Sequence, residues 1–407
     1  MSECLADWWD SEIWRHTGHG EYRNPVSPDV LLDSAPECIW PGLMDCDFIP
    51  LLGNSAGDWL CVRVDEKGNT DQIVQWYHGG GDWIPWGNSL SEALVFDAIT
   101  DRLPGPTRRH AEPAEDLRPV TGGSQTDALL AWAFEHQPGR VRDLLNTDTS
   151  DDVLAGELLD LGVAEIAIRC ELAIQHLTHP DRDGLQSALD GQAKSDVRPE
   201  WLFDIDRIPQ SQRQQLIDQG IDMDWNQRWD LAHDAAQPVT KLAPWLAWPW
   251  DVCGYAAERR GDRKDAADFY QQGAMCSVFT DQSIRLLTHW ASDHAAKFSV
   301  ARLQGFDPDR VTQSSYLRTL LGPDVQQRRG AVSEYWLGEA ATHESQKDFH
   351  ALHQCLIASA WDVGVDTIQA YAPLLERISQ AAIDSNQLAR AEVAATHRRC
   401  LRDRYGL

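Results

Sequence analysis

Apolar and polar residues alternate with a period of two along residues 59–65 and again along 72–78. This alternation predicts two half-buried β-strands, because successive side chains of a strand point to opposite faces. Glycine, asparagine and aspartate cluster between them, which predicts turns. Shorter strands are expected at 48–52 and 83–86, and a Ser-x-x-Glu capping box opens a helix over 89–102. The chain therefore begins with an α+β domain, an antiparallel meander closed by one helix.

Beyond residue 125 the apolar positions recur every three to four residues, which is the pattern of amphipathic helices. Proline and glycine interrupt every periodic pattern between 104 and 124, so this segment is expected to be a linker. Short connections such as 260–262 predict antiparallel helical hairpins. We therefore expect an α+β domain at 1–103, the linker at 104–124, and an all-α helical-hairpin domain at 125–407. Helices are expected at 126–135, 153–177, 210–219, 225–235, 252–260, 264–277, 282–303, 332–339, 347–364, 371–385 and 388–405.

The segment 261–274 resembles the middle of a tetratricopeptide repeat. Gly261 stands at the turn between two helices, and Ala266 and Tyr270 stand at packing positions. Residues 386–398 match the same pattern more weakly. The two segments lie 125 residues apart, which is no multiple of the roughly 34-residue period of such repeats. We expect an irregular stack of helical hairpins that is tetratricopeptide-like, rather than a regular solenoid.

Residues 47–99 resemble the SUKH superfamily, which groups the yeast cell-wall-assembly regulator domain with bacterial toxin-immunity proteins. The matching features stand in order as Phe48-Ile49-Pro50-Leu51, the Gly57-Asp58 turn, the strands at 59–65 and 72–78, and the helix that starts at Ser89. That family usually has an amphipathic helix before this sheet, and residues 1–46 show no clean version of it. The resemblance implies an α+β module that holds protein partners and has no catalytic residues.

Charge is distributed unevenly along the chain. The whole chain has 63 acidic and 36 basic residues, a net charge of −27. Residues 1–101 hold 18 of the acids and 4 of the bases, about half of the net charge in a quarter of the length. Such a surface disfavours nucleic acids, which need clustered Lys and Arg, and anionic membranes. It favours a basic protein partner.

The nine cysteines are scattered, and no two have Cys-x-x-Cys spacing. In a chain of this length they indicate reduced core thiols rather than a disulfide framework or a zinc site. The first residues form no basic and apolar signal peptide, and no apolar run reaches the roughly 20 residues of a membrane span. The expected location is the cytoplasm.

Residues 53–57 spell G-x-S-x-G, with His-Gly-Gly-Gly at 78–81, which together suggest the nucleophile elbow and oxyanion loop of an esterase. That mechanism needs a helix after the serine, whereas a strand is predicted there. Glycine-rich turns of a meander explain both motifs better. We expect no catalytic residues.

Histidines at 343, 350 and 353 could share one helical region, but they do not form H-E-x-x-H and offer no fourth ligand. Solvated helix histidines are the simpler interpretation, so no metal site is predicted. Neither a Walker-type phosphate loop nor a dinucleotide-binding fingerprint is present, so no nucleotide or other cofactor is inferred.

Tryptophan is abundant, with 18 residues, eight of them before residue 87. Core packing is the general explanation, because indole buries a large area. A sharper alternative is a contact surface of aromatic anchors rimmed by acids, and sugar stacking is a third. The candidate partner-binding residues are Trp76, His78, Asp82, Trp83 and Trp86.

These observations favour a non-enzymatic, cytoplasmic protein-binding module. Its particular form would be an immunity protein that neutralises a basic toxin, or a regulatory adaptor. One alternative is an enzyme, a hydrolase with its site in the helical domain or in the cleft between the domains. A second alternative is a structural subunit of a larger assembly. The sequence identifies neither the partner nor the oligomeric state.

Overall fold

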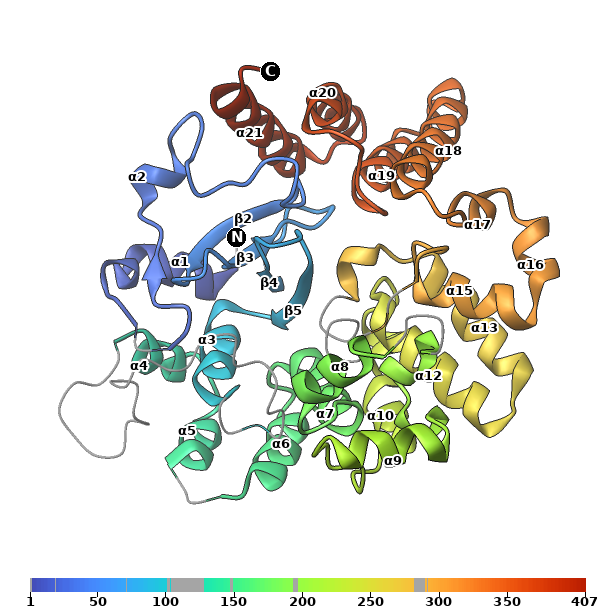
Figure 1. The fold of residues 1–407 in the computed structure, drawn as a ribbon. Coiled ribbons are helices and arrows are strands. Elements are labelled where there is room, and N and C mark those ends of the chain that lie inside the picture. Colours follow the sequence, from blue (N-terminus) through green and yellow to red (C-terminus); the bar gives the residue numbers. More distant parts are fainter. Residues whose placement is uncertain are drawn as a thin grey trace. The chain divides into compact units, whose positions relative to one another are not determined.

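The structure is a computed structural model that describes residues 2–18, 20–70, 72–100, 103, 128–146, 149–192, 197–281, 290 and 292–407 (Figure 1). The described residues form two compact units. Unit 1 contains those of 1–103, 111–168 and 329–407, and unit 2 contains those of 169–328. The N-terminal part of the chain carries the sheet and the remainder is helical, so the predicted fold class is confirmed.

The described strands of unit 1 form one antiparallel meander in the order β1-β2-β3-β4-β5. Its strands are β1 (Asn24–Pro25), β2 (Phe48–Gly53), β3 (Trp59–Arg63), β4 (Gln72–Trp76) and β5 (Trp83–Gly87). In the central strand, Cys61 lies opposite Pro50 of β2 and Val74 of β4. The chain turns from β2 to β3 at Gly57, whose φ of +92° would strain any residue with a Cβ. The alternation in the sequence therefore predicted β3 and β4 correctly, and the antiparallel meander was expected, whereas β1 was not.

The helices of unit 1 that precede residue 168 are α1 (Glu3–Asp10), α2 (Pro28–Leu31), α3 (Leu90–Ile99), α4 (Ala128–Glu135), α5 (Gly139–Asn146), α6 (Asp151–Asp160) and the start of α7 (Glu165–Leu177). Helix α3 begins at the predicted capping box, where Ser89 Oγ accepts the N–H of Glu92 at 3.2 Å. It packs on the sheet, with the ring of Phe96 edge-to-face on Trp86 at 4.6 Å. The single helix expected at 153–177 is instead α6 and α7, because the chain turns at Gly162, which has φ +70°.

Four helices complete the chain: α18 (Val325–Gln346), α19 (Phe349–Trp361), α20 (Ile368–Asp384) and α21 (Leu388–Tyr405). From residue 329 onward they belong to unit 1 together with the sheet. Helix α21 bonds the sheet directly, since Arg390 Nε donates to the carbonyl of Val64 at 2.9 Å and His397 Nε2 lies 3.1 Å from that of Phe48. The compact units thus differ from the expected division into 1–103 and 125–407, and the expected linker at 104–124 lies outside the described residues.

Three helical hairpins share one kind of turn. Gly261, Lys347 and Asn386 have φ of +81°, +57° and +62°, and they connect α12 (Ala247–Arg260) to α13 (Arg263–Ala274), α18 to α19, and α20 to α21. The residue five positions after each turn is buried: these are Ala266, Leu352 and Ala391. The first and third hairpins are those that resembled tetratricopeptide units in the sequence. Both helices of the second hairpin were expected, at 332–339 and 347–364, but α18 is longer than its expected limits.

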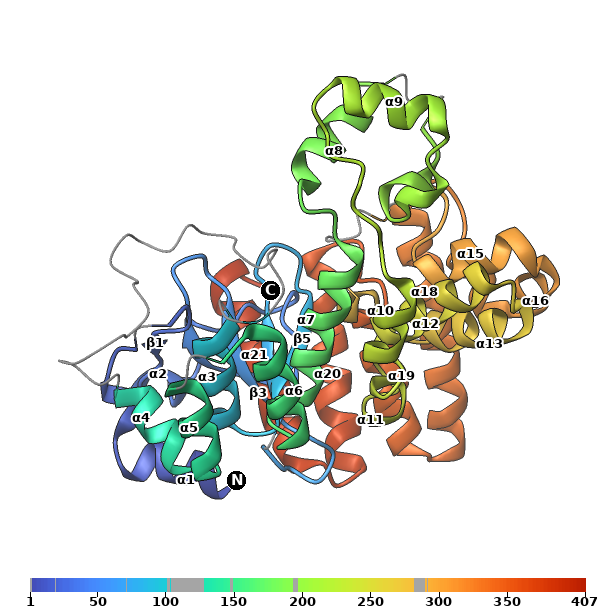
Figure 2. The ribbon, with the colours of Figure 1, turned by 90° about the horizontal axis from the view of Figure 1, so that it is seen from below.

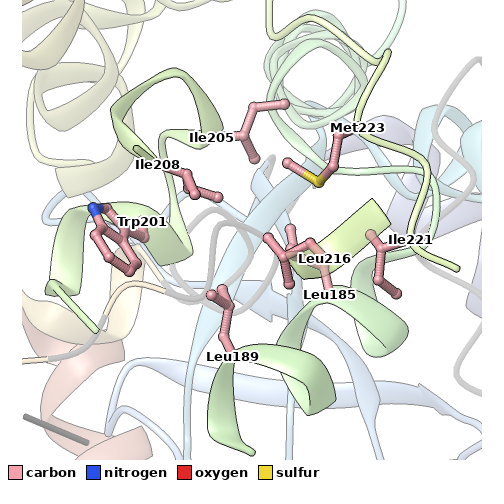
Figure 3. Packing of buried hydrophobic residues seen from close by; sticks show 8 residues of the cluster. All are labelled: Leu185, Leu189, Trp201, Ile205, Ile208, Leu216, Ile221 and Met223. Carbon is pink, nitrogen blue, oxygen red and sulfur yellow. The ribbon is translucent and has the colours of Figure 1, made fainter. Parts of the chain in front are cut away.

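The regular elements of unit 2 within its described residues are helices, joined by irregular segments. Besides α12 and α13 it contains α8 (Arg182–Asp190), α9 (Gln210–Asp218), α10 (Trp229–Ala236), α11 (Val239–Leu242), α15 (Phe298–Phe306), α16 (Pro308–Gln313) and α17 (Ser315–Thr319). At α8 and α9 (Figure 2) a compact apolar cluster forms around Leu185, Leu189 and Leu216. Figure 3 shows Trp201, Met223 and their neighbours pointing into this cluster.

Two details of unit 2 correct the expected helix limits. The helix expected at 252–260 starts earlier, because α12 begins at Ala247 and holds Pro249 in its first turn, where a missing N–H breaks no helical bond. Of the helix expected at 282–303, residues 282–289 and 291 lie outside the described part, and α15 begins at Phe298. Within the described residues, we find no helix with the length and apolar character that a bilayer span requires.

Candidate functional site

Four of the five predicted partner-binding residues lie in the core of unit 1. Trp76, Trp83 and Trp86 are 0%, 5% and 1% exposed, and Asp82 is 2% exposed. Trp76 and Trp83 face each other across β4 and β5. His78 alone among the five is exposed. The burial of the other four contradicts the expectation that they form a contact surface.

The tryptophans are buried because remote segments cover the sheet. Trp83 packs edge-to-face on Phe48 at 5.1 Å, and Arg63 lies over its ring. Trp76 is covered by Trp40, with ring centroids 6.5 Å apart, and its Nε1 donates to the carbonyl of Leu43 at 3.4 Å. These contacts join positions 20 or more residues apart, so periodicity within one strand could not reveal them.

The covering segment places its own apolar side chains at the surface. Trp40 is 36% exposed and Leu43 is 42% exposed; we call these two residues the Trp40 patch. The guanidinium of Arg404 lies 5.2 Å from the Trp40 ring centroid. Gly81, in the turn after β4, lies so close to the Leu43 carbonyl that a Cβ would come within 2.6 Å of it. The Trp40 patch therefore adjoins the turn that carries His78. The sequence did not indicate this patch, because Trp40 lies in no segment with a helical or strand period.

His78 is fixed at this turn by Asp58. One carboxylate oxygen, Oδ1, accepts the backbone N–H of His78 at 3.0 Å and also lies 3.0 Å from its Nδ1. Ser55, the serine of the G-x-S-x-G motif, is exposed in the turn between β2 and β3 and is followed by strand β3. The helix that a nucleophile elbow requires is absent after Ser55, so the motif is a glycine-rich turn, as the sequence indicated.

Part of the acidic N-terminal segment is neutralised by the chain itself. Helix α21 carries five arginines and two acids. Arg390 pairs with Asp47 at 3.2 Å, and Arg63 reaches the same carboxylate oxygen at 3.3 Å. Asp47 and Arg390 are both buried. We call this pair, with Arg63, the ionic seam; it shows that one basic partner of the N-terminal acids is intramolecular.

Buried titratable groups with shifted pKa values surround the ionic seam. Burial lowers the pKa of His353 and of His397 to about 4, because a low-dielectric site disfavours imidazolium. Burial and the neighbouring Asp47 carboxylate raise the pKa of Asp45. His350, exposed, instead lies 3.7 Å from Glu66. Nowhere in the described residues do three or more His, Cys, Asp or Glu side chains gather as a metal would require.

A pocket of about 440 Å³ lies elsewhere in unit 1; we call it the α1–α3 pocket. Its wall is formed by the first turns of α1 and α3 and by the segments 136–138 and 161–163. Its volume is within the range of roughly 300–1,000 Å³ that is typical of small-ligand sites. No sequence motif indicated it, because four distant segments build it.

Hydrogen bonds order the polar wall of this pocket. Ser91 Oγ accepts the amide of Gln137 at 2.8 Å and lies 2.9 Å from Ser89 Oγ. Asp7, beside the pocket, accepts Trp132 Nε1 at 2.6 Å and lies 3.0 Å from His136 Nε2. The Trp132 bond, more than the others, lowers the pKa of the Asp7 carboxyl.

Cys4 lines the pocket as well. Burial raises the pKa of its thiol, although the Ser91 hydroxyl and the backbone N–H groups of Ser91 and Leu90 act in the opposite direction. The thiol is therefore protonated near neutral pH and is not an activated nucleophile.

Unit 1 is thus an α+β domain in which the C-terminal helix α21 packs on the sheet. It has an exposed aromatic patch and a separate polar pocket. The chain matches no family model, no curated protein and no solved structure.

Proposed function

We propose that this chain is a non-enzymatic, cytoplasmic protein-binding module whose unit 1 binds a basic protein. An immunity protein against a basic toxin, or a regulatory adaptor, is the particular form that the SUKH resemblance of residues 47–99 favours. The proposal no longer relies on Trp76, Asp82, Trp83 and Trp86, which are buried. It relies on the residues that remain at the surface.

The charge balance of the exposed residues is the observation that carries the proposal. In the described part of 2–100, eight acidic side chains are exposed, against two basic ones, Arg15 and Lys67. Asp47, in the ionic seam, is buried and does not enter this count. Two of the exposed acids pair within the chain, Glu12 with Arg15 and Glu66 with His350 and Arg390, and the exposed acids still outnumber the exposed bases of this segment. Exposed acids steer a basic protein toward the domain and favour its binding at low salt. The exposed acids are Glu3, Asp10, Glu12, Glu21, Asp29, Asp33, Glu37 and Glu66.

The Trp40 patch supplies an apolar anchor on the same unit. Partly exposed tryptophan is enriched among residues that dominate binding energy at interfaces. Trp76 packs against Trp40, and the Arg404 guanidinium lies over the Trp40 ring, so Trp40 would lose little conformational freedom on binding. His78, on the adjoining turn, is the one originally predicted residue that stays in the proposed interface.

Affinity capture with the full chain tests this proposal. Extract of the source cell is passed over immobilised wild type, Trp40→Ser and Leu32→Ser at low and at moderate salt. Leu32 is 83% exposed and outside the patch, so it is the matched control. We expect a basic protein that wild type and Leu32→Ser retain, that Trp40→Ser loses, and that salt weakens. Failure to retain any protein at low salt, or equal retention by Trp40→Ser, would overturn the proposal.

A second candidate, an enzyme, is favoured by the Asp7–His136 pair beside Cys4 in the α1–α3 pocket. The pocket lies within unit 1, and its wall takes residues from both segments that were expected to be separate domains, 1–103 and 125–407. Because the Cys4 thiol is protonated, we prefer a binding role for this pocket to a catalytic one.

A further inference from the structure

The α1–α3 pocket has a charge imbalance. Among the described residues that line it, two are carboxylates, Glu3 and Glu92, and none is lysine or arginine. The N-termini of α1 and α3 open on the pocket and oppose this charge, each by about half an elementary charge. Two full carboxylate charges exceed two half charges, so the pocket favours a cation.

Glu92 is held in position at the pocket wall. Its Oε2 accepts the backbone N–H of Asn88 at 3.0 Å and that of Ala164 at 3.2 Å. Gln137 donates its amide N–H to Ser91, which leaves its amide oxygen as an acceptor. The pocket thus combines fixed acceptors of two kinds, carboxylate and amide oxygen, without a donor cation of its own.

Part of the wall is apolar. Pro138, Leu161 and Val163 line it. An alkyl chain can lie along such side chains while its charged end meets the carboxylates, as the stems of lysine and arginine do. The pocket therefore suits a cation with an alkyl stem better than a bare ion.

We propose that the α1–α3 pocket binds an alkyl guanidinium group. Guanidinium is planar, keeps its charge at all accessible pH values and presents five donors that match carboxylates in pairs. It is also more weakly hydrated than ammonium, which favours transfer into a partly enclosed site. The group can belong to a free small molecule or to an arginine of a protein partner. The chemistry is the same in both cases and does not depend on the proposed function.

Calorimetric titration of the full chain with n-butylguanidinium tests the proposal, with n-butylurea as the neutral ligand of the same shape. We expect n-butylguanidinium to bind and n-butylurea not to bind. Glu92→Gln should weaken binding about tenfold, as expected for a charged hydrogen bond, and Glu3→Gln should weaken it a few-fold because Glu3 is exposed. Glu37→Gln, an exposed carboxylate of unit 1 outside the pocket, should leave it unchanged.

Equal binding of n-butylurea, absence of n-butylguanidinium binding, or an equal loss in Glu37→Gln would overturn the proposal. If Glu92→Gln lowers the melting temperature of the protein, binding to Glu3→Gln still tests the proposal, because Glu3 has an exposed side chain at the start of α1. A protein captured as described above separates the two sources. Its displacement by n-butylguanidinium assigns the group to the partner's arginine, and binding without displacement assigns it to a small molecule. Failure of capture with n-butylguanidinium still bound would count against the proposed function alone.

Discussion

Replacing Arg390 by methionine should release helix α21 from the sheet. The guanidinium of Arg390 is buried and bonds Asp47 at 3.2 Å and the Val64 carbonyl at 2.9 Å. Methionine fills a similar volume, but it removes the positive charge and the hydrogen bond that Arg390 gives to the buried Asp47 carboxylate. Removing one partner of a buried pair typically costs about 3–5 kcal/mol. Because Arg63 still reaches Asp47, we expect the lower end, about 3 kcal/mol.

Native-state hydrogen exchange measures this change locally. The amides of α21 should exchange roughly 100-fold faster in Arg390→Met, since about 1.4 kcal/mol corresponds to a factor of ten. Arg398→Met is the matched control on the same helix, because its pair with Glu376 is exposed on both sides. Such surface pairs contribute about 0–1 kcal/mol, which is at most about a fivefold change. Equal acceleration in the two variants would refute the idea that the ionic seam holds α21.

Three further predictions test the core, the buried histidines and the turns. Trp76→Ala should lower the free energy of unfolding by about 3–5 kcal/mol. Trp40→Ala removes a partly exposed ring that also covers Trp76, and it should lower the free energy of unfolding by a smaller amount, about 1–2 kcal/mol. Urea melts that gave equal losses would contradict the assigned burial. The free energy of unfolding should fall as pH drops from about 6.5 to 4, because His397 binds a proton in the unfolded chain but, buried with its pKa lowered to about 4, does not bind one in the folded chain. His397→Gln should remove up to about 3 kcal/mol of that pH dependence. An unchanged pH profile in His397→Gln would contradict this assignment. Gly261→Ala should destabilise the protein by about 1 kcal/mol, because Gly261 has a φ of +81°. Gly338→Ala, at an exposed helical position, should stabilise the protein by up to about 1 kcal/mol. Thermal melts in which the midpoints of both variants shift in the same direction would contradict this prediction.

The sequence predicted those parts of the fold that are decided locally. Alternation along 59–65 and 72–78 gave strands β3 and β4 in their observed pairing. The hairpin turn at Gly261 was visible because glycine is the usual residue at positive φ. The equivalent turn at Lys347 was missed because lysine carries no such signal, although its φ is +57°.

Long-range packing could not be predicted from local patterns. The burial of Trp76 depends on Trp40, and the docking of α21 depends on Arg390 and Asp47, which are 343 residues apart. An alternating strand indicates one buried face but does not reveal whether other segments cover the second face. The predicted aromatic surface was therefore placed on residues that another part of the chain covers.

The most direct test of the central claim is a hydrogen-exchange footprint of the captured basic partner on the full chain. If unit 1 binds through the Trp40 patch, the partner should slow exchange at residues 36–44 and 77–82, and raising the salt concentration should weaken this protection. Protection confined to residues 169–328, or protection that is insensitive to salt, would contradict the claim.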